Sequence, residues 1–173
     1  PLVIHACEGF VLQATGGLRL EERYGAQIQL WRDLLEREQS SPEFRDYASK
    51  RLLDLLQRRE RIAQTRQLET RFSQACQQFQ KQKGRLPETL QTLVSEGVLR
   101  FVPPSPMDAL GAEVVPDVSG PDEWVILPDG SVRSRKRAAL RAGLMMNRLY
   151  DAVYDYYHKH NRTLPPDLNA LVE

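Results

Sequence analysis

Residues 72–94 read FSQACQQFQKQKGRLPETLQTLV, and this stretch decides the fold. Its first part carries apolar residues three or four positions apart, which is the spacing of one face of a helix. These are Phe72, Ala75, Cys76 and Phe79. Gly84 is a residue type that ends helices, and Pro87 suits the first turn of a new one. We therefore predict a helix end, a polar link and a short second helix, whose Leu90 and Leu93 pack back on the first.

The same pattern returns 78 positions later, in residues 150–172, which read YDAVYDYYHKHNRTLPPDLNALV. Every apolar position of the first copy meets an apolar or aromatic residue in the second, and the Leu-Pro pair has the same phase. We predict a repeated unit. The tyrosines and valine that align with the first helix are expected to be core residues: Tyr150, Val153, Tyr154 and Tyr157. Because the second copy reaches Glu173 before any strand, we expect the natural chain to continue.

The fold class predicted is mainly α with a small antiparallel β-sheet (α+β). Residues 1–41 form an N-terminal helical hairpin, interrupted at Gly16 and Gly17. Residues 42–134 form a first unit, with a long amphipathic helix over 42–83 and a sheet lobe. Ser41 is a good N-cap, and Pro42 suits the first helical position. Residues 135–173 begin a second unit with a helix over 137–160. Apolar residues are sparse at 57–71, so the long helix is either exposed or bent there.

The composition is that of an ordinary globular protein, and the net charge excludes a polycation. The chain has 173 residues, of which 41% are hydrophobic and 27% charged, as in an ordinary globular protein. Its net charge is +1, so binding to nucleic acid or an anionic surface would depend on local charge. No apolar run approaches the roughly 20 residues of a membrane span.

Cys7 and Cys76 form either one disulfide or two separate buried thiols, and the latter interpretation is favoured.

The first repeat unit resembles the globular head of type II secretion pseudopilins and type IV pilin-like proteins. The resemblance rests on the corner Gly84–Leu93, the loop Pro106–Gly111, and three candidate strands at 112–115, 124–127 and 131–134. It implies a small antiparallel sheet packed on a long helix. The helix departs from a pilin, because its first half carries arginines instead of a hydrophobic membrane segment. The calcium loop of that family is not matched either.

The N-terminal helices resemble a tetratricopeptide hairpin. Ala26, Leu30 and Leu34 are four residues apart, and Pro42 follows eight residues after the last of them. The resemblance implies a protein-binding groove. A plain amphipathic helix pair explains the same spacing, and both interpretations stay open.

No catalytic set is found. The chain has no glycine-rich phosphate loop, no HExxH and no CxxC motif. Asp151, Asp155 and His158 share a helix face, but a solvated polar face explains them better than a metal site does. We therefore expect no enzymatic activity, no cofactor and no bound metal.

Two functional hypotheses stay open. The repeat, the absent catalytic set and the pilin resemblance motivate the first, and the separation of charge along the chain motivates the alternative. Residues 50–83 carry nine Lys and Arg against three acids, and residues 133–141 are also basic. The first hypothesis is a protein-interaction or scaffold module, in a cell-envelope secretion or pilus-related assembly. The alternative is binding of nucleic acid or an anionic surface through the two basic runs.

We expect a protein partner that the sequence does not name, and we do not expect a small-molecule ligand. The cell envelope or periplasm is favoured over the cytoplasm. The partner-binding residues proposed from sequence are Trp31, Arg58, Arg59, Arg61 and Tyr156. Tyr156 has no core counterpart in the first copy, and an arginine-rich helix surface can steer an acidic protein partner.

Overall fold

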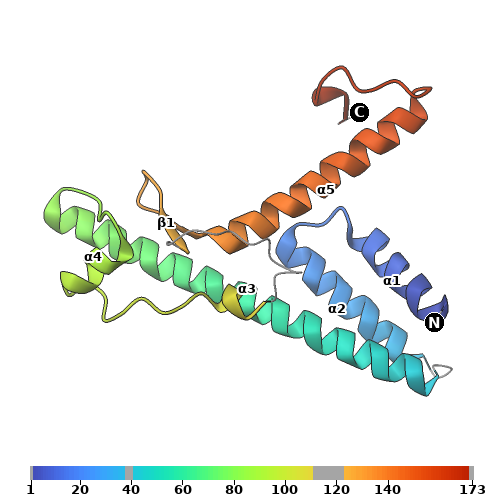
Figure 1. Cartoon of the computed structure of the whole chain (residues 1–173), viewed down its shortest axis with the longest axis horizontal. Coiled ribbons are helices and arrows are strands. Elements are labelled where there is room, and N and C mark those ends of the chain that lie inside the picture. Colours follow the sequence, from blue (N-terminus) through green and yellow to red (C-terminus); the bar gives the residue numbers. More distant parts are fainter. Residues whose placement is uncertain (1, 38–40, 111–122, 172–173) are drawn as a thin grey trace.

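The computed structural model describes residues 2–37, 41–110 and 123–171 (Figure 1). The mainly helical class with a small antiparallel sheet is confirmed. The elements run in the order α1 (Leu2–Thr15), α2 (Leu20–Glu36), α3 (Pro42–Lys83), α4 (Leu90–Ser95), η1 (Pro106–Ala109), β1 (Trp124–Ile126), β2 (Val132–Ser134), α5 (Arg135–Lys159) and η2 (Asn169–Leu171).

Helix α3 is the longest of the described helices, and capping residues determine where it begins and ends. At its start the Ser41 hydroxyl accepts a hydrogen bond from the Phe44 N–H, and Pro42 occupies the first turn. At its end Gly84 has φ 73°, a left-handed conformation that glycine adopts without steric cost. The helix is continuous through residues 57–71, so the helix predicted over 42–83 is confirmed. At 1.5 Å per residue its 42 residues span about 63 Å.

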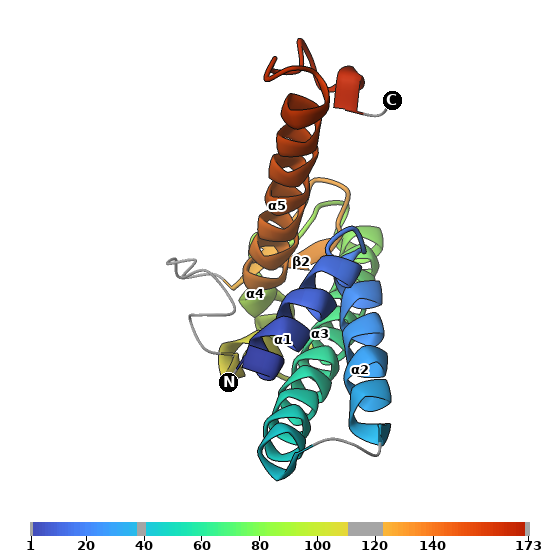
Figure 2. The same ribbon diagram turned by 90° about the vertical axis from the view of Figure 1, so that its right-hand side faces the viewer.

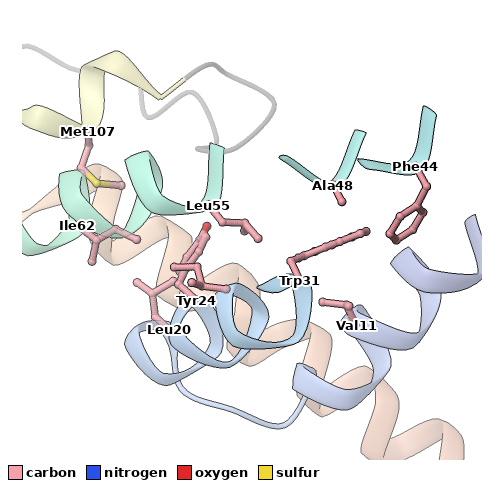
Figure 3. Close-up of a cluster of buried hydrophobic side chains, with 10 residues drawn as sticks. Val11, Leu20, Tyr24, Trp31, Phe44, Ala48, Leu55, Ile62 and Met107 are labelled. Atoms are coloured by element: carbon pink, nitrogen blue, oxygen red, sulfur yellow. The ribbon is translucent and has the colours of Figure 1, made fainter. Parts of the chain in front are cut away.

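The first hydrophobic core lies between α1, α2 and the first half of α3 (Figure 3). Its buried members are Val11, Leu20, Tyr24, Ile28, Trp31, Phe44, Ala48, Leu55, Ile62 and Met107. Leu140 and Leu144, near the start of α5, pack against it. This core continues across residue 41, where the sequence suggested the end of the N-terminal hairpin.

A second core surrounds the last turns of α3. The buried face of α3 meets α4, the following loop and the β1–β2 hairpin; the members are Phe72, Ala75, Cys76, Phe79, Leu90, Leu93, Leu99 and Val132. Trp124 of β1 meets the Phe72 ring edge to face, with centroids 4.9 Å apart. The hairpin is antiparallel and pairs Trp124 with Ser134 and Ile126 with Val132. The strand expected at 112–115 lies outside the described residues.

Helix α5 leaves the rest of the molecule. Figures 1 and 2 show its first turns beside α2 and the hairpin, and its later turns projecting away from the other helices. The chain then turns back toward α5, and the described residues end with η2. The two cores therefore belong to the first part of the chain, and α5 extends from them as an arm.

The two cysteines are free and lie in different places. Cys7 packs at the edge of the first core, whereas Cys76 is inside the second. The structure therefore contains two separate thiols.

Candidate functional site

The apolar helix face that the two repeat copies share, called here the stripe, is buried in the first copy and largely exposed in the second. It consists of Phe72, Ala75, Cys76 and Phe79 in the first copy and of Tyr150, Val153, Tyr154 and Tyr157 in the second. In the first copy the stripe is buried under α4 and the hairpin, and Phe72 is 1% exposed. In the second copy Tyr150, the counterpart of Phe72, is 70% exposed. Tyr154, the counterpart of Cys76, is 53% exposed. The expectation that these two tyrosines are core residues is therefore wrong.

The reason is that the covering segment has no counterpart in the second unit as described. The first stripe is closed by the loop and hairpin that follow α4, with Leu99 and Val132 among the buried residues. After α5 the described residues contain only the polar link and the short η2 turn. Leu168, the counterpart of the buried Leu90, is 67% exposed.

The exposed residues form one continuous surface along α5. Positions 146, 150, 153 and 157 lie three or four residues apart, so they share a helix face, and position 154 borders it. We call this surface the α5 stripe; it consists of Met146, Tyr150, Val153, Tyr154 and Tyr157. Val153 and Tyr157 are half-buried, and the other three are exposed. A contiguous exposed apolar patch of this kind marks interaction surfaces in soluble proteins.

The tyrosine rings of the stripe are arranged against each other along the helix. The Tyr150 and Tyr154 rings stack with centroids 6.5 Å apart and planes 20° apart. The ring of His158 follows one turn later, 4.3 Å from that of Tyr154. The result is a row of aromatic faces, which combine large apolar area with few rotatable bonds.

Trp31 does not lie on this surface. Its side chain is 2% exposed and packs in the first core near Phe44 (Figure 3). Its ring also meets that of Tyr47, with centroids 6.0 Å apart. In this structure its ring holds α2 to α3 and is not available to a partner.

The three arginines proposed from sequence do not form one surface. Arg58 is half-buried and binds Asp54, with Nη2 2.8 Å from Oδ2. Arg59 borders a hollow beside Tyr24, whereas Arg61 borders another beside the Pro103–Pro106 segment. The two exposed side chains therefore face different sides of α3.

Tyr156 lies beside the α5 stripe rather than in it. It is half-buried, and its ring stacks on His160 with centroids 3.9 Å apart. Successive helical residues point about 100° apart, so Tyr156 borders the stripe through its neighbour Tyr157. Its partner-binding role stays a prediction.

The chemistry available in the described residues is limited. No group of three His, Cys, Asp or Glu residues in ranges 2–37, 41–110 and 123–171 is close enough to hold a metal ion. Burial raises the pKa of the Cys76 thiol to about 11, so it is not poised as a nucleophile. Within the same ranges, no helix combines the length and apolar content needed to cross a membrane.

Comparison with known proteins gives no further assignment. No family model, no curated protein and no solved structure matches this chain.

Proposed function

We propose that this protein is a non-catalytic interaction module that binds a partner protein through the α5 stripe. The observation that carries the proposal is the difference between the two copies of the repeat. The stripe that the first unit buries is presented on an extended helix in the second. Tyrosine is enriched among the residues that dominate binding energy, and methionine is enriched in protein interfaces.

The first unit indicates the chemistry of the partner. There, two leucines of a short helix and apolar residues of a hairpin cover the stripe, including Leu90, Leu93 and Val132. A partner that covers the α5 stripe would present a comparable set: leucine and valine side chains from a short helix or a hairpin. The stripe has no charged member, so the contact would be apolar at its centre with polar residues around it.

The absence of charge in the stripe favours a protein over nucleic acid as its occupant. Nucleic-acid binding depends on arginines and lysines that neutralise phosphates. Aromatic rings alone stack on bases, but single-strand binders combine such rings with a basic groove. The α5 stripe offers rings without that groove, which suits an apolar protein surface.

A role in a cell-envelope secretion or pilus-related assembly belongs to the same proposal. Its support is the pilin-like order of elements in the first unit, in which a long helix, a Leu-Pro corner and a two-stranded hairpin follow one another. The tetratricopeptide-like interpretation of α1 and α2 likewise stays a proposal, supported by their antiparallel packing.

Site-directed photo-crosslinking tests this function. The full-length protein, carrying benzoylphenylalanine in place of Tyr154, is irradiated in its native cells, and crosslinked peptides are identified by mass spectrometry. The matched control carries the same group at Asp155, an exposed neighbour that points about 100° away. We expect crosslinks from position 154 to an apolar segment of one other protein, lost when Tyr150→Glu is added, and none from position 155.

Other crosslinks would overturn the proposal. Crosslinks only to nucleic acid, only to a second copy, or only within the same polypeptide would each assign the stripe a different occupant. A failure of position 154 to exceed position 155 would remove the stripe as a binding surface.

A further inference from the structure

A second feature, separate from the α5 stripe, is an arginine-lined cleft. It lies where the start of α2, the middle of α3, β2 and the first half of α5 meet, and it encloses about 830 Å³. Cavities of this size accommodate small-molecule ligands. Six arginines and three glutamates line it, which gives a local excess of positive charge. The arginines are Arg19, Arg66, Arg133, Arg137, Arg141 and Arg148.

The cleft unites the two basic runs seen in the sequence. Arg66 comes from the run at 50–83, while Arg133, Arg137 and Arg141 come from the run at 133–141. Positions 137, 141 and 148 of α5 are separated by four and seven residues, so they share the helix face that lines the cleft. Tertiary structure therefore concentrates charges that are about 70 residues apart in sequence.

A buried ion pair fixes one wall of the cleft. Arg137 and Glu69 are both almost fully buried, and Nη1 of Arg137 donates to Oε2 of Glu69 at 2.9 Å. Nη2 of Arg137 donates to Oε1 of Glu21 at 2.7 Å. The Ser134 N–H donates to the other Glu69 oxygen at 3.0 Å. These bonds hold α2, α3 and α5 in one arrangement, so the cleft is preorganised.

The hydrogen-bonding capacity of Arg137 is not used up. Its Nε is buried and has no hydrogen-bond partner among the described residues. Buried polar atoms in folded proteins are nearly always paired with protein groups, water or a ligand, so this donor is open to an acceptor from outside the protein.

Three further arginines leave their charge available to the cleft. Arg66, Arg141 and Arg148 form no direct ion pair with any residue of the described ranges, and all three are exposed. Arg141 acts on Glu21 through its charge: burial raises the pKa of that carboxyl, but the hydrogen bond from Arg137 and then the charge of Arg141 lower it below its usual value. The three arginines come from two helices, α3 and α5, that both line the cleft. A guanidinium group presents a planar fork of donors that matches the oxygens of phosphate and carboxylate.

We propose that the cleft binds a polyvalent oxyanion of small-molecule size, bearing phosphate groups or clustered carboxylates. The three unpaired arginines contact the anion from both helices, and the Arg137–Glu69 pair holds the wall between them. The sequence did not predict this site, because its residues are distant along the chain. Nucleic acid fits less well, because Arg58 is paired with Asp54 and neither Arg59 nor Arg61 lines the cleft. The basic residues therefore form a pocket rather than an extended track.

Isothermal titration calorimetry of the full-length protein tests the proposal. The probes are inorganic pyrophosphate and citrate, which separate phosphate from carboxylate recognition, together with a 20-nucleotide single-stranded DNA. The test variant is Arg66→Gln with Arg141→Gln. The control is Arg71→Gln with Lys159→Gln, which removes the same charge from exposed positions on the same two helices outside the cleft.

We expect at least one small anion to bind and Kd to rise at least about tenfold in the test variant, because charge-assisted hydrogen bonds are lost. The control should bind like the unmodified protein. Higher salt should weaken binding, since the contact is ionic. The proposal is overturned if neither pyrophosphate nor citrate binds, if only the DNA binds, or if the two variants lose affinity equally.

Discussion

Residues 72–94 and 150–171 have the same spacing of apolar side chains, yet the structure treats them differently. The first set closes a core with α4 and the β1–β2 hairpin. The second set forms the surface of a projecting arm. Both copies form the helix, because local sequence and helix ends decide that. Burial depends on what packs against the helix afterwards, and only the first copy has such a segment among the described residues.

The comparison explains why an apolar stripe alone does not identify a core. A helix with one apolar face needs another surface to cover it, from its own chain or from a partner. In the first unit the chain supplies that surface. In the second unit no described residue beyond η2 supplies it, and the proposed partner would do so.

The largest expected effect separates the two copies at their first aligned position. Phe72→Ala removes a buried ring and leaves a cavity, so the free energy of unfolding should fall by about 3–5 kcal/mol. Tyr150→Ala, at the exposed counterpart, should change it by less than about 0.5 kcal/mol. Urea denaturation followed by circular dichroism measures both. A comparable loss in the two variants would mean that the α5 stripe is buried in solution.

A slightly smaller effect tests how the arm is attached. Glu69→Ala leaves Arg137 without its buried partner, and losing one member of such a pair costs about 3–5 kcal/mol. We expect the lower end of this range, because Arg137 keeps its bond to Glu21. The control is Glu88→Ala, whose exposed side chain makes only a 3.9 Å contact to Arg85. If thermal melts show no difference between these two variants, the pair does not anchor α5.

A third prediction compares the two copies by thiol chemistry. Burial raises the pKa of Cys76 to about 11, so at pH 8 this thiol should be almost entirely protonated and inaccessible. Its counterpart Tyr154 is exposed, so Tyr154→Cys in a Cys7→Ser background should react rapidly with a thiol reagent. The thiolate fraction of Cys76 should rise only as pH approaches 11. Equal rates of labelling at pH 8 would show that the two stripes are equally accessible.

Much of the fold could be predicted because it depends on local signals. Ser41 with Pro42 marked the start of α3, and Gly84 marked its end. The Asp129 and Gly130 turn marked the hairpin, whose Asp129 carboxylate accepts a bond from the Ser131 N–H. Capping and turn chemistry involve residues within about four positions of each other, so the sequence shows them directly.

The surfaces could not be predicted in the same way. The bonds from Arg137 to Glu69 and Glu21 join residues 68 and 116 positions apart, and no local pattern indicates such pairs. Tryptophan is common both in interfaces and in cores, and the structure places Trp31 in a core. The alignment showed that no strands follow the second copy, but the apolar spacing alone predicted a core at Tyr150 and Tyr154, which the structure leaves exposed.

Hydroxyl-radical labelling of aromatic side chains tests the central claim most directly. The purified protein is labelled and each residue's modification is divided by its value in the unfolded chain, which corrects for the different reactivities of Phe and Tyr. We expect Tyr150 and Tyr154 to approach the unfolded level, while Phe72 and Phe79 stay strongly protected. Protection of Tyr150 and Tyr154 equal to that of Phe72 would contradict the claim that the second stripe is open to a partner.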